Sequence, residues 1–105
     1  MERDGAGIDV TLDEEHRRLE ARVGGRLAGI AEYIPAGRLF AFVHTEVEPE
    51  FEGRGVGSAL ARAGLEMVRT LDGRYLAVCP FIAGWAARHP EYDPWRHRPT
   101  SKVVD

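Results

Sequence analysis

The sequence contains very little cysteine and lysine, and it has no long run of apolar residues. Cys79 is the only cysteine, so no disulfide can form within the chain and a reducing compartment suits it. Lys102 is the only lysine, which excludes a P-loop, because that phosphate-binding motif needs a lysine directly after its last glycine. No apolar run approaches the length of a membrane span, and the polar segment 1–9 does not resemble a secretory signal. We therefore expect a cytoplasmic protein that does not bind membranes.

The sequence also lacks a strong excess of positive or negative charge. The formal net charge is −3, and acidic and basic residues are interspersed, so no basic stripe indicates nucleic acid as a partner. No spacing of His, Cys and Asp suggests a metal site. A chain of 105 residues with 44% hydrophobic residues fits one folded domain, which we assign to 1–105. The sequence gives no indication of the oligomeric state.

Glycine, in contrast, is concentrated at one place. Gly53, Gly55 and Gly57 alternate between a strand-like apolar run and an amphipathic helical pattern. Glycine lets the backbone turn tightly and lets a ligand come close. A helix that begins at such a loop presents unpaired N–H groups and the positive end of its dipole. We therefore expect the segment 53–58 to bind a pyrophosphate; the alternative is an ordinary glycine-rich loop that caps a helix.

The spacing of these glycines does not match the dinucleotide-binding fingerprint Gly-x-Gly-x-x-Gly. Counted from Gly53 the last position is Ser58, and counted from Gly55 it is Leu60. The acidic, proline-containing connector 48–50 also separates the glycines from the strand, whereas the fingerprint follows its strand directly. A dinucleotide site of that kind is therefore excluded.

Hydrophobic alternation predicts a strand over 18–23, and two runs that are apolar on both faces predict strands over 27–34 and 39–47. Turns at Gly24-Gly25 and at 35–37 would join them into an antiparallel meander. A short additional strand is expected within 4–13.

The second half of the chain begins with a helical pattern. Val56, Leu60, Gly64, Met67, Val68 and Leu71 share one face. A short buried strand is expected over 75–79, parallel to the strand 39–47 because a helix crosses between them. Pro80 begins a second helix over 81–88, which Pro90 stops. The segment beyond Pro90 is expected to be irregular.

This order of elements resembles the core of the GNAT (GCN5-related) N-acetyltransferases. The pyrophosphate loop of that family reads Val-x-Pro-x-x-(Gln/Arg)-x-x-Gly-x-(Gly/Ala), and Val47, Pro49, Gly55 and Gly57 fall on it without gaps. Glu52 stands where Gln or Arg is usual. Because a carboxylate beside a pyrophosphate is unfavourable, we expect the Glu52 side chain to point away and its backbone amide to contribute instead.

Two further segments are similar to a compact branch of this family that lacks the usual N-terminal helices. The run 44–49 resembles its His-Thr-x-Val-x-Pro segment, and Cys79-Pro80 with the run 89–92 resembles its Cys-Pro…His-Pro-x-Tyr segment. The resemblance covers about 17–92. It implies an α+β fold with an α/β-like core, built on a mixed, mostly antiparallel sheet.

The resemblance implies acetyl-coenzyme A as co-substrate, bound in a wedge between two parallel strands that diverge. A backbone N–H of Thr45 or Val47 would face the thioester carbonyl and stabilise the charge that develops there. Arg54 would reach a phosphate oxygen or remain a solvated loop residue. The residues expected to bind the coenzyme are Thr45, Val47, Gly53, Arg54, Gly55, Val56, Gly57 and Ser58.

The catalytic side chains are open to more than one interpretation. His44 and Glu46 share one face of their strand and could remove the proton of an amine, directly or through water. A β-bulge at this point would shift that phase. His44 would otherwise pack beside Phe42, and Glu46 would be a solvated strand end.

Three more residues are catalytic candidates. Cys79 would either accept the acetyl group as a nucleophile or be a small buried residue that lines the wedge. His89 or Tyr92 would protonate the departing thiolate, or else anchor the tail.

We therefore expect an N-acetyltransferase that moves an acetyl group from acetyl-coenzyme A to an amine on a small molecule or a protein, by direct attack. The alternatives are a coenzyme-A-binding module or partner subunit without turnover, and a thioester hydrolase that uses Cys79.

Overall fold

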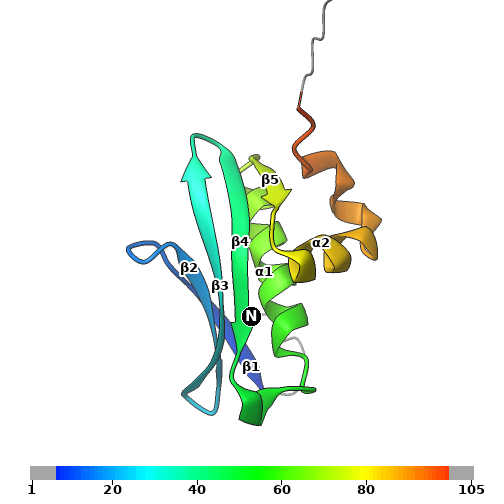
Figure 1. Ribbon diagram of the computed structural model, residues 1–105. Coiled ribbons are helices and arrows are strands. Elements are labelled where there is room, and N and C mark those ends of the chain that lie inside the picture. The colour runs from blue at the N-terminus through cyan, green and yellow to red at the C-terminus, as the bar shows by residue number, and fades with distance from the viewer. Residues whose placement is uncertain (1–6, 100–105) are drawn as a thin grey trace, which may run out of the picture.

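The computed structural model describes residues 7–99, which form a five-stranded sheet with helices packed against it (Figure 1). The spatial order of the strands is β1-β2-β3-β4-β5; the first four are antiparallel to their neighbours, and β5 is parallel to β4. This confirms the α+β class and the expected order of meander, strand, glycine loop, helix, strand and helix. The elements are β1 (Ile8–Asp13), β2 (Arg18–Val23), β3 (Arg26–Ala36), β4 (Leu39–Val47), the 3-10 helix η1 (Pro49–Phe51), α1 (Val56–Thr70), β5 (Arg74–Ala77), α2 (Pro80–Ala87) and the 3-10 helix η2 (Pro90–Trp95).

The hairpin between β3 and β4 is tighter than the sequence predicts. The turn expected over 35–37 begins only at Gly37, whose φ of 62° suits glycine, and β3 continues through Pro35. A proline is tolerated there because the pairing of β3 with β2 ends at Glu32, so its missing N–H breaks no hydrogen bond to β2. The additional strand expected within 4–13 is β1, and the part of that range before residue 7 lies outside the described residues.

Helix α1 packs across the sheet and contacts all five strands. Val56, Leu60, Gly64 and Val68 are buried on its inner face, as the periodicity predicts. Leu71, which was expected on this face, is 51% exposed because α1 ends at Thr70 and the chain turns away. At Gly64 an added Cβ would lie 2.9 Å from the Phe42 ring, so the helix approaches β4 closely at this point.

The segment beyond Pro90 is ordered, contrary to the expectation of an irregular tail. The Tyr92 hydroxyl donates a hydrogen bond to Glu66 of α1 at 2.6 Å, and Tyr92 is buried. Farther along, the His97 amide donates to the Tyr75 carbonyl on the outer edge of β5. These long-range contacts hold the segment in place, and local proline content does not reveal them. The strand β5 is also shorter than predicted, because it ends where β4 turns away from it.

No helix in residues 7–99 is long and apolar enough to cross a membrane. No group of three or more His, Cys, Asp and Glu side chains in the same range is placed to hold a metal ion.

Candidate active site

The strands β4 and β5 diverge to form a wedge. They pair only from Leu39 to Phe42 of β4, and Figure 1 shows β4 continuing past the end of β5. At the apex the amides of Val78 and Cys79 both donate to the Phe42 carbonyl, at 3.0 and 2.8 Å. The segment 43–47 of β4 therefore has an edge that β5 does not cover, which is the wedge that the sequence resemblance implies.

A β-bulge lies where β4 leaves β5. The pairing of β3 with β4 shifts between Glu32 and Tyr33, which leaves Val43 as the extra residue of β4. Phe42 is 1% exposed beneath α1, whereas the His44 side chain is 54% exposed, although the two lie only two residues apart. The alternative of a His44 packed beside Phe42 is therefore wrong, because the bulge turns His44 to the other face.

His44 and Glu46 lie together on the face of β4 opposite to the Phe42 side chain. The Nε2 atom of His44 is 3.4 Å from Oε1 of Glu46, and both side chains are exposed. The bulge precedes His44, so the two residues keep their common face. A base and a carboxylate in contact and open to water form an arrangement that can accept a proton from an amine.

The backbone groups of β4 alternate between β3 and the wedge. The Glu48 amide donates to the Ala28 carbonyl at 2.8 Å, so the even-numbered residues of this segment turn their backbone groups toward β3. The backbone N–H and C=O groups of Thr45 and Val47 then point to the uncovered edge. The geometry is thus suitable for the role that the resemblance implies for these two residues.

The side chains of Thr45 and Cys79 meet at the apex of the wedge. The sulfur of Cys79 lies 3.5 Å from the Thr45 hydroxyl oxygen, and Cys79 is only 7% exposed. Burial raises the pKa of the Cys79 thiol, but the Thr45 hydroxyl and the amides of Phe81 and Ile82 at the start of α2 outweigh it and bring the pKa below its usual value. The Cys79 thiolate therefore forms more readily than that of an ordinary cysteine, in spite of the burial.

Replacing Thr45 by valine should raise the pKa of Cys79. Valine keeps the branched shape but removes the hydroxyl that stabilises the thiolate, so the thiolate should appear only at higher pH. The ultraviolet absorbance of the thiolate against pH measures this, and the single cysteine makes the signal unambiguous. Thr11→Val on β1 is the control and should leave the midpoint unchanged. Equal midpoints for Thr45→Val and the wild type would remove Thr45 from this role.

The glycine loop lies between η1 and α1. Gly53 and Gly55 have φ of 78° and 86°, which side chains rarely adopt, and Gly55 is the N-cap of α1. The first hydrogen bond of the helix runs from the Ala59 amide to the Gly55 carbonyl. The amides of residues 56–58 therefore have no acceptor within α1, and no acidic residue lies in its first turn. This end of the helix is suited to bind an anion.

Glu52, which precedes the helix, differs from the expectation. The Glu52 amide donates to the Pro49 carbonyl at 3.2 Å, so it is already used and the idea that it contributes to the anion site is wrong. The Glu52 residue itself is exposed. The Arg54 guanidinium lies over the Phe51 ring, 5.4 Å from its centre, which holds the arginine beside the loop.

Gly57 lies against a side chain of α2. An added Cβ at Gly57 would lie 2.7 Å from the end of the Phe81 ring, which extends from the first turn of α2. Phe81 is 41% exposed and covers the start of α1 from the side of the wedge apex. Sequence reasoning did not find Phe81, because only the tertiary fold brings 57 and 81 together.

His89 and Tyr92 lie at the far end of α2. His89 stacks on Trp85 with ring centres 3.6 Å apart and shares a hydrogen bond with the Trp85 carbonyl. Burial and the hydrogen bond to Glu66 raise the pKa of Tyr92 to about 12. Cys79 caps the opposite end of this helix, which is about 12 Å long at about 1.5 Å per residue. The structure therefore does not bring either residue to the apex of the wedge.

The chain is similar to known proteins in both sequence and fold. A family model described as GCN5-related N-acetyl-transferase matches residues 18–95. The protein NATD1 of Bos taurus is 32% identical over 89 residues, which cover 82% of this chain and 78% of the relative. NATD1 of Gallus gallus is 30% identical, with 82% and 80% covered. A solved structure of a GCN5-like protein from Staphylococcus aureus matches with a TM-score of 0.66 and 18% identity, over 93% of this chain and 96% of that one.

Proposed function

The chain belongs to the GCN5-related N-acetyltransferases, and we propose that it transfers an acetyl group from acetyl-coenzyme A to an amine by direct attack. One observation carries the proposal: the uncovered edge of β4 begins at the apex beside Cys79, and the amides at the start of α1 lie beside Phe81, in the first turn of the helix that Cys79 begins. The edge suits an extended amide-containing arm, and the amides suit a diphosphate. When bound, the coenzyme supplies the acetyl thioester.

Each part of the site has a role in this proposal. The amides of Val56, Gly57 and Ser58 bind the diphosphate. A backbone N–H of Thr45 or Val47 donates to the carbonyl oxygen as it gains charge, and one such donor contributes roughly 3 kcal/mol to transition-state stabilisation. The walls of the wedge hold the reacting groups in register, which lowers the barrier further.

The pair His44 and Glu46 accepts the proton that the amine releases. Their contact of 3.4 Å and their exposure place a proton acceptor where water can relay it. The distant positions of His89 and Tyr92 give no support to a catalytic role, so we assign both to the packing of η2 against α1 and α2.

A second route through Cys79 is favoured by the contact of its sulfur with the Thr45 hydroxyl, which accompanies a lowered pKa of the thiol. In that route the Cys79 thiolate would attack the carbonyl carbon of acetyl-coenzyme A and release the coenzyme thiol. The amine would then attack the acetyl-cysteine thioester, take the acetyl group and free the Cys79 thiol. Both routes give the same products, so the assay must separate them.

Release of coenzyme A thiol from acetyl-coenzyme A, measured across a panel of amines, tests the function. For direct transfer we expect release that depends on the amine and survives in Cys79→Ala within about threefold, because no covalent step is lost. Loss of release in this variant, together with an acetyl mass adduct on Cys79 in the wild type, would establish the covalent route. Binding without release would indicate a module without turnover, and release without any amine would indicate a hydrolase.

A further inference from the structure

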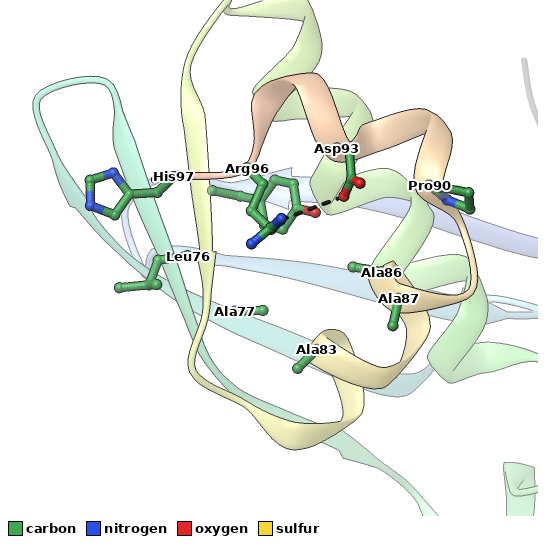
Figure 2. Close-up of a pocket in the computed structure, with 10 residues that line it drawn as sticks. Leu76, Ala77, Ala83, Ala86, Ala87, Pro90, Asp93, Arg96 and His97 are labelled. Carbon is green, nitrogen blue, oxygen red and sulfur yellow. Dashed lines mark ion pairs between the residues drawn. The ribbon is translucent and has the colours of Figure 1, made fainter. Parts of the chain in front are cut away.

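A cavity of about 460 Å³ lies between β5, α2 and η2 (Figure 2). Sites for small molecules usually measure roughly 300–1,000 Å³, so this cavity is large enough for one. The residues that line it all fall within 75–97, and none of them comes from β4 or from the glycine loop. The cavity is therefore separate from the wedge, although α2 borders both.

The outer edge of β5 forms one wall of this cavity. Tyr75, Leu76 and Ala77 follow one another in the strand and all line it. Consecutive side chains of a strand point to opposite faces, so a cavity lined by all three lies against the backbone edge of the strand. Because β4 pairs with the other edge of β5, this is the outer one.

On this edge the backbone groups of Ala77 are unpaired. The amides of Arg74 and Val78 donate to carbonyls of β4 at 2.9 and 3.0 Å. Backbone groups alternate along a strand, so those of Tyr75 and Ala77 point to the outer edge. The Tyr75 carbonyl accepts a hydrogen bond from the His97 amide. The N–H and C=O of Ala77 have no hydrogen-bond partner among residues 7–99, which leaves one donor and one acceptor for a ligand.

Small side chains leave space beside these groups. Ala83 and Ala87 line the cavity from α2, are one helical turn apart and are exposed. Figure 2 shows the Ala77 side chain pointing toward that helix. In a sheet, a residue that pairs directly with Ala77 has its side chain on the same face. An apolar side chain of such a residue would therefore lie over the alanines of α2.

The charged side chains of the cavity are already paired with each other. Asp93 and Arg96 line it from η2 and its end, with 3.5 Å between Oδ1 and Nε, and each is about half exposed. A charged ligand group of either sign would compete with this ion pair. Figure 2 shows the His97 ring turned away from α2. These contacts favour an uncharged ligand that uses the backbone of β5.

We propose that the cavity binds a short extended peptide segment with an apolar side chain. The Ala77 N–H donates to a carbonyl of the peptide, and the Ala77 carbonyl accepts a hydrogen bond from the N–H of the same peptide residue, as in an antiparallel pair. The apolar side chain of that residue packs against the alanines of α2. The proposal concerns binding alone and holds whether or not the chain transfers an acetyl group.

Titration with N-acetyl-leucine N-methylamide, followed by amide chemical shifts, tests the proposal. One pair of hydrogen bonds and one side chain predict a dissociation constant of about 1 mM. The Ala77 amide proton should shift most, because it gains an acceptor. Absence of saturable shifts up to about 20 mM would overturn the proposal. Largest shifts at Thr45 and Val47 would also overturn it, because the amides would then be bound by the uncovered edge of β4.

Two analogues of the probe test its separate contacts. Methylation of the leucine nitrogen removes the N–H that pairs with Ala77, and N-acetylglycine N-methylamide lacks the side chain that packs against α2. Each should bind at least about fivefold more weakly than the leucine compound. Equal binding of the nitrogen-methylated analogue would show that no backbone pairing occurs.

Two variants of the protein locate the binding. Ala77→Pro removes an N–H that takes no part in the pairing with β4, so the fold should persist while the probe is lost. Ala83→Leu should block binding by filling the space, and Thr70→Leu, which adds apolar bulk at the exposed end of α1, should not. Thermal unfolding shows whether each variant is folded. Unchanged affinity in folded Ala83→Leu would place the peptide elsewhere and contradict the proposal.

Discussion

Replacing Ser58 by glutamate is expected to weaken binding of acetyl-coenzyme A by about 100-fold, because it sets a carboxylate against the diphosphate. Ser58 is exposed in the first turn of α1, beside the amides that lack an acceptor within the helix. A negative charge at the start of a helix is favourable, so the free energy of unfolding should stay the same or rise by about 0.5 kcal/mol. Calorimetric titration with acetyl-coenzyme A measures the affinity, and thermal unfolding shows that the fold is intact.

Ser58→Gln is the matched control, since it has the same size without the charge. It should bind the coenzyme within a few-fold of the wild type. Substitutions of the glycines are less selective, because φ at Gly55 is 86° and a side chain at Gly57 would displace Phe81. If Ser58→Glu bound acetyl-coenzyme A as tightly as the wild type, the start of α1 would not be the diphosphate site.

Gly29→Ala should lower the free energy of unfolding by about 3 kcal/mol, which is a large overpacking effect for one methyl group. An added Cβ would lie 2.8 Å from the Glu46 carbonyl oxygen and 2.9 Å from Val56. The first contact is with the backbone of β4 and the second with the buried start of α1, so neither neighbour can move aside easily. Urea unfolding at equilibrium measures the change.

The matched control is the same substitution in α2. At Gly84 an added Cβ meets only the end of the Arg88 side chain, at 3.6 Å. Alanine is favoured over glycine inside a helix, so Gly84→Ala should raise the free energy of unfolding by up to about 1 kcal/mol. A Gly29→Ala protein as stable as the wild type would mean that β3 and α1 are not packed this closely.

Much of the fold could be predicted from local pattern. The apolar runs of β2, β3 and β4 and the helical period of α1 predicted these elements at nearly the observed bounds. The expectation that β4 is apolar on both faces fails beyond the bulge, where His44 and Glu46 are exposed. The errors fall where distant segments decide the outcome. Pro35 looked like a turn but sits in a strand whose neighbour has already ended, and Tyr92 looked like part of a loose tail but is bound to Glu66.

The candidate site, like the fold, could be predicted only in part. The glycine spacing and the motif around Val47 predicted the loop and the wedge. The sequence alone did not show that the Glu52 amide is used by Pro49, nor that Phe81 covers Gly57. It also gave no signal for the cavity beside Tyr75, because that cavity depends on how η2 returns to β5.

The sequence by itself determined the strands, the helices α1 and α2, their order and the loop suited to an anion, because periodicity and glycine conformation act over a few neighbouring residues. Only the tertiary structure decided which side chains meet. The bulge at Val43 sets the face of His44, and the contact of Thr45 with Cys79 joins residues far apart in the chain. Such contacts depend on strand register and helix packing, and these are settled by the whole core together rather than by any local segment.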